Sequence, residues 1–208
     1  SYNFADVMLQ GDITNITGMG FTAYYAQVGA TGTGTSDDPG SLAGAEASGA
    51  QYIVLLNDGV GAQDVFDAAS AGGSFDLAAG QALISFLNQD FFAVSGASVP
   101  ANLVLTGVGP AGITNPYAGS GGAVLTSTLA GSATVNLANN STIDGLVIRN
   151  AAGDVGVAAS GVSGVRILNS DISGAAGAIA ISDGSAASSV QLTNLDLGST
   201  SGVTLALS

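Results

Sequence analysis

The chain has 208 residues, of which 47% are hydrophobic and 8% are charged, so we expect an ordered, packed protein rather than a disordered acidic tail. Two Arg, no Lys, no His and 15 acidic residues give a formal net charge of −13, which argues against nucleic acid and anionic membranes as partners. The absence of Cys excludes a disulfide framework, and no apolar run reaches the roughly 18 residues of a membrane-spanning helix.

The N-terminal segment, residues 1–30, is predicted to consist of strands that precede the main domain. Residues 4–16 and 20–28 alternate apolar and polar side chains, which is the pattern of a strand with one buried face. Nothing else in the sequence obviously pairs with them, so we expect this segment to be a cap, a linker or a strand donated to another molecule. Because the chain opens on Ser1 without a basic segment, we interpret it as a mature or excised piece.

Residues 31–59 are predicted to contain a loop, a short helix and a strand. The loop is rich in Gly and Asp, and the helix begins after Ser41 with a run of Leu and Ala. Gly40 and Gly44 are expected to weaken this helix, because Gly is a poor helix former. Residues 50–59 form an apolar run of strand length, which predicts a buried strand.

Three acidic residues near this helix are candidates for a structural Ca²⁺ site. They are Asp37, Asp38 and Asp58, and carboxylate oxygens are the ligands that Ca²⁺ prefers. Solvation of these loops is the alternative interpretation, because the spacing matches no known calcium-binding loop.

The middle of the chain is less regular but compatible with stacked strands. Residues 62–71 predict a short helix, and residues 74–77, 81–86 and 102–107 are apolar segments of strand length. Residues 107–122 are rich in Gly and Pro, which predicts a long loop that leaves the stack.

From about residue 132 onward the chain repeats a pattern of aliphatic residues that alternate with others and end on Asn. Three segments share it: residues 145–150, 164–169 and 189–194. The steps between them, about 19 residues and then about 25 residues, have the length of a solenoid coil. Their aliphatic residues are expected to point inward as stacked rows: Leu146 and Ile148, Val165 and Ile167, Val190 and Leu192. Further alternating strands are predicted between them, at residues 156–159, 178–181 and 203–207.

The Asn residues that end the three repeats are predicted to stack at one corner of the solenoid. They are Asn150, Asn169 and Asn194. An amide side chain both donates and accepts, so each can bond to the coil above or below it. The alternative is that Asn is simply common in turns.

These patterns predict an all-β right-handed parallel β-helix over residues 31–208. The order of strand, loop, short helix and strand over residues 24–59 resembles the first coil of pectate-lyase-like β-helices, in which the helix caps the end of the stack. The later coils are similar to the β-helical passenger regions of large bacterial surface proteins, including adhesins and inverse-autotransporter-like proteins. The resemblance is specific for the fold, because this solenoid carries many unrelated functions.

The resemblance also implies two kinds of catalysis as alternatives. Pectate lyases use an Arg or Lys base beside Ca²⁺-binding carboxylates, and Arg149 and Arg166 are the candidates; we expect both to face solvent and pair with a nearby Asp. Polygalacturonase-like hydrolases need clustered carboxylates. The candidates are Asp144, Asp171 and Asp196, of which only the last two share a position in their repeats.

Ice binding is a third alternative, since it uses a flat face of regularly repeated Thr. The candidate residues are Thr126, Thr128, Thr134 and Thr142, and none of them recurs at one position in every coil.

The expected function is therefore a non-catalytic extracellular module at a bacterial cell surface: a stalk, an adhesin passenger segment or a filament subunit. The expected partner is another copy joined end to end, or a glycan or protein of a host or cell surface. We expect no catalytic residue and no cofactor, apart from the Ca²⁺ considered above. A polysaccharide lyase or hydrolase and an ice-binding solenoid remain the alternatives.

Overall fold

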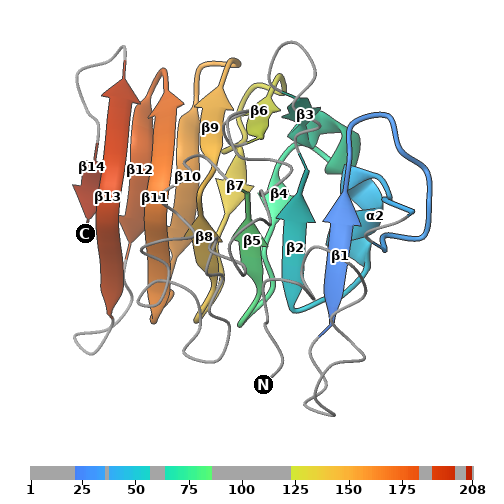
Figure 1. The fold of residues 1–208 in the computed structure, drawn as a ribbon. Coiled ribbons are helices and arrows are strands. Elements are labelled where there is room, and N and C mark those ends of the chain that lie inside the picture. Colours follow the sequence, from blue (N-terminus) through green and yellow to red (C-terminus); the bar gives the residue numbers. More distant parts are fainter. Residues whose placement is uncertain are drawn as a thin grey trace, which may run out of the picture.

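The computed structural model describes residues 22–35, 38–56, 64–85, 123–182, 189–199 and 205–207. In this part of the chain the strands pair in parallel and stack coil upon coil into a β-solenoid of about five turns (Figure 1). The helical elements described are one short α-helix and one turn of 3₁₀-helix. The prediction of an all-β parallel β-helix is confirmed.

The larger sheet has nine strands. Two series of short parallel strands, called here the first and the second ladder, run side by side and both pair with one longer strand. The first ladder consists of β1 (Ala23–Ala26), β2 (Tyr52–Leu55), β5 (Ala82–Ile84) and β8 (Thr142–Asp144). The second consists of β3 (Val65–Asp67), β6 (Val124–Ser127) and β9 (Val147–Asn150). Both ladders continue into the two halves of β11 (Val165–Gly174), which pairs along its length with β13 (Val190–Ser199).

The second sheet closes each coil and contains one strand from each. Its members in stacking order are β4 (Phe75–Asp76), β7 (Val135–Asn136), β10 (Val155–Ser160), β12 (Gly177–Ser182) and β14 (Leu205–Leu207). The core lies between the two sheets, because inward side chains of both belong to one buried apolar cluster. The predicted strands at residues 156–159, 178–181 and 203–207 correspond to the last three members.

The core is built from rows of aliphatic side chains that stack one per coil. The first row is Ile53, Leu83, Ile143, Ile167 and Leu192. The second row is Phe66, Leu125, Ile148, Ile172 and Leu197. Apart from Phe66 the members of both rows are aliphatic, which explains how a chain with 6% aromatics builds a core.

The predicted alignment of residues 145–150 with 164–169 is wrong. Ile148 lies opposite Ile172, and Ile143 lies opposite Ile167. The two residues of each pair are therefore separated by one full coil. Residues 145–150 belong to the second ladder, whereas 164–169 belong to the first. The two ladders carry the same alternation of apolar and polar residues, so the local pattern alone does not distinguish them; the register is fixed by long-range stacking. The predicted step from 164–169 to 189–194 is confirmed by the pairing of Ile167 with Leu192.

The corner between the two ladders differs among the coils. In the last three coils a single residue turns it in the left-handed region: Gly145 (φ 73°), Asn169 (φ 48°) and Asn194 (φ 53°). In the coil before them, Ser85 and Ala123 are the described residues on the two sides of this corner. The Ser85 hydroxyl donates to the Leu55 carbonyl (3.0 Å) and accepts from the Ala123 amide (2.8 Å), which joins Ser85 directly to Ala123.

The N-terminal end of the solenoid is capped as predicted. Helix α2 (Leu42–Ala47) buries Leu42 and Ala45 against the core, and the Ser41 hydroxyl caps it by accepting from the Gly44 amide (3.0 Å). β1 pairs with β2, so the stack begins before residue 31. Figure 1 shows β1 and α2 together at one end of the stack and β13 and β14 at the other.

The glycines expected to weaken the cap are required by its packing. A Cβ on Gly44 would lie 2.2 Å from the Tyr24 hydroxyl, and one on Gly40 would lie 1.9 Å from it. Gly34 (φ 86°) lies against the same ring, since a Cβ there would meet it at 2.2 Å. The three glycines thus make room for Tyr24, which packs against the core from β1.

Two further expectations are resolved in part. The predicted helix at residues 62–71 is strand β3 followed by the 3₁₀-helix η2 (Ala68–Ala71). The predicted strand at residues 4–16, the loop at 107–122, and Asp37 and Asp58 lie outside the described residues.

Both faces of the first ladder are buried in its early strands. Their outward residues are as buried as the inward ones: Tyr52 (1% exposed), Val54, Ala82 and Ile84. This explains why β2 and β5 read as continuous apolar runs rather than alternating ones. Toward the C-terminal end the same outward row opens to solvent, with Arg166 half-buried and Gln191 exposed.

Candidate functional site

Two of the three predicted ladder residues, Asn169 and Asn194, stack at the corner between the two ladders of the larger sheet. The Asn194 amide nitrogen donates to the Asn169 amide oxygen (3.0 Å), and β13 and β11 align in the register that places them opposite each other. The Asn169 nitrogen in turn donates to Oδ1 of Asp144 (2.8 Å). The amides therefore form a directed chain of hydrogen bonds that ends on a carboxylate.

Asn150 does not belong to this ladder. It lies opposite Gly174 and Ser127 in the second ladder of the sheet. Its side chain donates to the Ser132 carbonyl (2.8 Å) and accepts from the amides of Ala152 (3.1 Å) and Asp154 (3.0 Å). Asn150 thus closes the turn from β9 to β10, a local role that its sequence pattern does not distinguish from stacking.

Asp144 is the buried end of the ladder, and sequence reasoning considered it only as a hydrolase carboxylate. It is 1% exposed and follows the inward Ile143 on β8. Its backbone carbonyl also accepts from the Ser85 amide (2.9 Å), which ties it to the preceding coil. Burial of this side chain removes it from any polysaccharide bound at the surface. The sequence signal was its position immediately before Gly145, the glycine that turns the corner.

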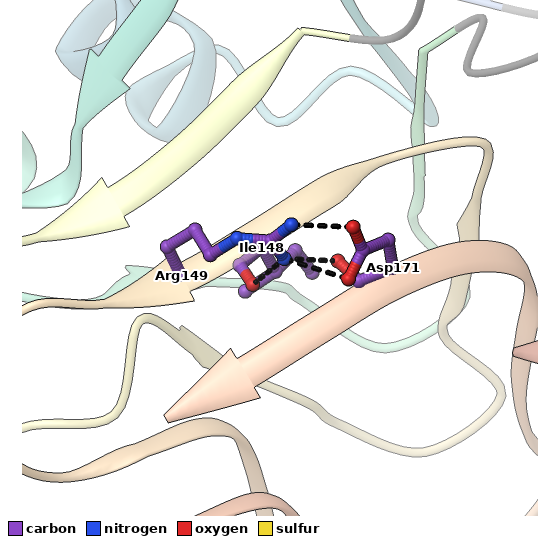
Figure 2. A network of polar contacts seen from close by, with 3 residues as sticks. All are labelled: Ile148, Arg149 and Asp171. Atoms are coloured by element: carbon purple, nitrogen blue, oxygen red, sulfur yellow. Dashed lines mark hydrogen bonds and ion pairs between the residues drawn. The ribbon is translucent and has the colours of Figure 1, made fainter. Parts of the chain in front are cut away.

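Arg149 and Asp171 form an ion pair between neighbouring coils (Figure 2). Nη1 of Arg149 donates to Oδ1 of Asp171 (2.8 Å), to its backbone carbonyl (3.0 Å) and to the Ile148 carbonyl (3.0 Å), and Nη2 contacts Oδ2. The side chains are 37% and 33% exposed, so the pair lies at the surface. The expectation that Arg149 faces outward and pairs with an Asp is confirmed.

The predicted stack of Asp171 and Asp196 is present, since the two residues are partners in the β11–β13 register. Asp171 is held by Arg149, whereas Asp196 is exposed on the last described strand of this sheet. Arg166, the other lyase candidate, donates from Nε to the Gln191 side-chain oxygen (3.1 Å). The two Arg therefore lie on different ladders, and the structure does not bring them together at one centre.

Of the three Ca²⁺ candidates, only Asp38 lies within the described residues. Its Oδ2 accepts from both the amide and the hydroxyl of Thr33, at 2.9 Å each. The hydrogen bond from the Thr33 amide, assisted by the hydroxyl, lowers the pKa of Asp38 below its ordinary value. Gly32 is required here, because a Cβ on it would lie 2.1 Å from Oδ1 of Asp38. This carboxylate closes its own loop.

Asp67 is a second carboxylate whose role is structural. Oδ1 caps η2 by accepting from the Ala69 amide (3.0 Å), and Oδ2 accepts from the Thr128 hydroxyl of the next coil (2.8 Å). Partial burial pushes the pKa of Asp67 upward, but the hydrogen bonds from Ala69 and Thr128 outweigh it, so the pKa lies below its ordinary value.

The Thr residues considered for ice binding do not form one face. Thr134 and Thr142 are buried, and the Thr134 hydroxyl donates to the Arg149 carbonyl (2.8 Å). Thr128 is exposed but bonded to Asp67. Their hydroxyls point to different surroundings, so they present no flat repeated array.

Within the described ranges, no three His, Cys, Asp or Glu side chains lie close enough together to hold a metal ion. No helix in that part of the chain is long and apolar enough to cross a membrane. The geometry defines the class of the protein: it is a parallel β-solenoid whose coils are joined by polar side-chain bonds as well as by strands. Comparison with known proteins matches no family model, no curated protein and no solved structure.

Proposed function

We propose that this chain is a non-catalytic structural or adhesive module: a stalk, an adhesin passenger segment or a filament subunit. One observation carries the proposal. Several polar side chains form bonds that join one coil to the next: Asn194 to Asn169, Asn169 to Asp144, Arg149 to Asp171, and Asp67 to Thr128. Such bonds resist the separation of coils, which is what a spacer under load requires.

The same bonds weigh against a lyase. A catalytic base has to reach the proton that it removes, directly or through one water. The Arg149 guanidinium instead donates hydrogen bonds to the Asp171 carboxylate and to two backbone carbonyls, so the Asp171 carboxylate is paired with Arg149. Asp144 is too buried to meet a polymer chain. A hydrolase needs two accessible carboxyl groups flanking one glycosidic bond.

The proposed location is extracellular, at a bacterial cell surface. A net charge of −13 and the absence of Lys favour a molecule that stays apart from other acidic surfaces. The absence of Cys is compatible with an oxidising environment. The proposed partners are another copy of the chain, or a glycan or protein of a host or cell surface.

A turnover assay tests the non-catalytic part of the proposal. The 208-residue chain is incubated with polygalacturonate or alginate and Ca²⁺, and unsaturated product is followed by absorbance beside a known lyase as positive control. No product is expected from the wild type or from Arg149→Met. Sustained turnover that Arg149→Met abolishes would overturn the proposal and make Arg149 the base.

A binding assay tests the adhesive part. The chain is immobilised and exposed to arrays of surface glycans and to extracellular-matrix proteins. Saturable binding that survives Arg149→Met supports an adhesin. Absence of binding leaves a stalk or a filament subunit as the structural role.

A further inference from the structure

The outer edge of β1 is covered by a loop that folds back onto it. On its inner side β1 pairs with β2. On its outer side the Tyr25 amide donates to the Gly34 carbonyl (2.8 Å), and the Gly40 amide donates to the Tyr25 carbonyl (2.9 Å). The Gln27 amide donates to the Gly40 carbonyl (3.0 Å). We call the residues that make this cover, 32–35 and 38–40, the edge loop.

The edge loop is held closed by the carboxylate of Asp38. Oδ2 of Asp38 accepts hydrogen bonds from both the amide and the hydroxyl of Thr33 (2.9 Å each). Beside this contact the Gly32 amide donates to the Pro39 carbonyl (2.9 Å). The Gly34 amide donates to the Asp38 carbonyl (2.9 Å). Because hydrogen bonds to a charged acceptor are stronger than neutral ones, the Asp38 carboxylate is the main closure of the loop.

The edge loop is attached to the rest of the molecule by few contacts. None of its residues belongs to the buried apolar cluster between the sheets. It rests on Tyr24, since a Cβ on Gly34 would lie 2.2 Å from the Tyr24 ring and one on Gly40 would lie 1.9 Å from the Tyr24 hydroxyl. Segments with few buried apolar contacts open at a lower free energy than the core beside them. The edge loop can therefore detach while the stack of coils stays folded.

Detachment of the edge loop removes the hydrogen-bond partners from the outer edge of β1. An uncovered strand edge is a template for pairing with another chain, and folded proteins cover such edges with a loop or a helix. We propose that the edge loop is an autoinhibitory cover: closed by Asp38, it blocks strand pairing at this end of the solenoid, and its release lets the β1 edge pair with a second copy of the chain. The inference concerns assembly and does not depend on the proposed structural or adhesive role.

The β1 edge is self-complementary, which makes a second copy its partner. Both the amide and the carbonyl of Tyr25 face the outer edge, where they now bond to the edge loop. In an antiparallel pair, residues directly opposite each other exchange both of these bonds, so Tyr25 can pair with Tyr25 of the second copy. A contact that uses the same surface on both copies is closed and gives a dimer. The net charge of −13 on each copy opposes this contact, so the dimer should tighten as salt rises.

Exchange of the Tyr25 amide hydrogen with solvent tests whether Asp38 holds the cover. In Asp38→Ala we expect this amide to exchange on the order of tenfold faster than in the wild type, a change that corresponds to about 1.4 kcal/mol. The amides of Tyr52 and Leu56, which donate across the pairing of β1 with β2, should keep their protection. They are the internal reference, because opening of the whole first coil would expose all three amides.

Two glycine variants give a matched pair. Gly34 (φ 86°) and Gly29 (φ 75°) both lie in the left-handed region, so Ala at either position carries a similar backbone strain. A Cβ on Gly34 meets the Tyr24 ring, whereas one on Gly29 meets nothing within 4 Å. Gly34→Ala should therefore release the cover as Asp38→Ala does, and Gly29→Ala should leave it closed.

Sedimentation velocity of the 208-residue chain, at low and high salt, tests whether release leads to pairing. Both copies have to open before they pair, so a tenfold gain in the open fraction lowers the dimer Kd by up to about a hundredfold. This gain is expected in Asp38→Ala and Gly34→Ala relative to the wild type and Gly29→Ala. Protection of the Tyr25 amide should return as the concentration of the released variants rises. Thermal unfolding of each variant verifies that it is folded.

Four results would overturn the proposal. An unchanged exchange rate of the Tyr25 amide in Asp38→Ala shows that the carboxylate does not hold the cover. Equal loss of protection at Tyr52 and Leu56 shows that the first coil opens as a whole. Release without tighter association, or association that leaves the Tyr25 amide unprotected, shows that this edge does not pair with a second copy. Growth beyond a dimer, or equal tightening in Gly29→Ala, places the contact elsewhere.

Discussion

Asn169 is the residue whose replacement should reveal most about how the coils are held together. It adopts φ 48°, donates to Oδ1 of Asp144 and accepts from Asn194. Asn169→Gly keeps a residue suited to the left-handed region but removes both side-chain bonds. A hydrogen bond is worth about 0.5–1.5 kcal/mol net, and a buried acceptor left without its donor costs about 1–3 kcal/mol more, so we expect a loss of about 2–4 kcal/mol in the free energy of unfolding.

Three related variants separate the contributions. Asn169→Ala adds the cost of a left-handed alanine, about 1 kcal/mol beyond the glycine variant. Asn169→Asp replaces the donor to Asp144 by a second carboxyl group and is expected to be the least stable of the series. Asn194→Gly is the control, because it removes one exposed amide bond at the outer end of the ladder and should cost about 1 kcal/mol.

The measurement is urea unfolding of each variant, supported by thermal melts, in which about 1 kcal/mol corresponds to a shift of roughly 2–4 °C for a chain of this size. If Asn169→Gly costs no more than Asn194→Gly, the bond to the buried carboxylate contributes nothing to stability. The reasoning about the directed ladder would then be refuted.

Contacts elsewhere in the solenoid give three further predictions. Gly44→Ala should lower the melting temperature of the wild type despite the better helix propensity of Ala, because the added Cβ meets the Tyr24 hydroxyl. In a Tyr24→Ala background that contact is absent, so the same change should stabilise the fold by up to about 1 kcal/mol in thermal melts. Because the pKa of Asp67 is lowered in the folded state, its charged form stabilises the fold. This stability is fully present above the unfolded pKa of about 3.9 and is lost as pH falls through the folded pKa. The difference in unfolding free energy between wild type and Asp67→Asn should therefore shrink between about pH 5 and pH 2. A constant difference would contradict this. Arg149→Met should lower the free energy of unfolding by about 1 kcal/mol at low salt and by less at high salt. The reason is that Asp171 then lies beside the Asp196 carboxylate without the counterion that Arg149 provides.

The fold was predictable because its signals are local. Alternating aliphatic residues identify β11, β12 and β13, and the run after Ser41 identifies the capping helix. The coil register was not predictable for Asn150, because the two ladders carry the same short pattern and only stacking across a whole coil distinguishes them. Local periodicity determines which face a residue takes, but not which neighbour it meets.

The structural roles of individual polar residues were harder to foresee. Asp144 was considered as a hydrolase carboxylate, yet it is buried at the end of the amide ladder. Gly44 was expected to weaken its helix, yet the space that a Cβ would take is occupied by Tyr24, which lies on another element and is close to Gly44 in space. The first depends on a contact between coils and the second on a contact between β1 and α2, and neither is contained in the pattern of a single strand or helix.

The corner that holds Ser85 has a consequence for how this scaffold can change. Later coils turn there with a single residue, whereas Ser85 and Ala123 meet at this corner across a sequence separation of 38, and β6 is in register with β9. The Ser85 hydroxyl bonds to the Ala123 amide, so these two residues are neighbours in space. Closing a longer loop between fixed points costs little, since the penalty grows only with the logarithm of its length. The corner is therefore a natural grafting position, where foreign segments of varied length should be accepted while the stacked strands keep their order.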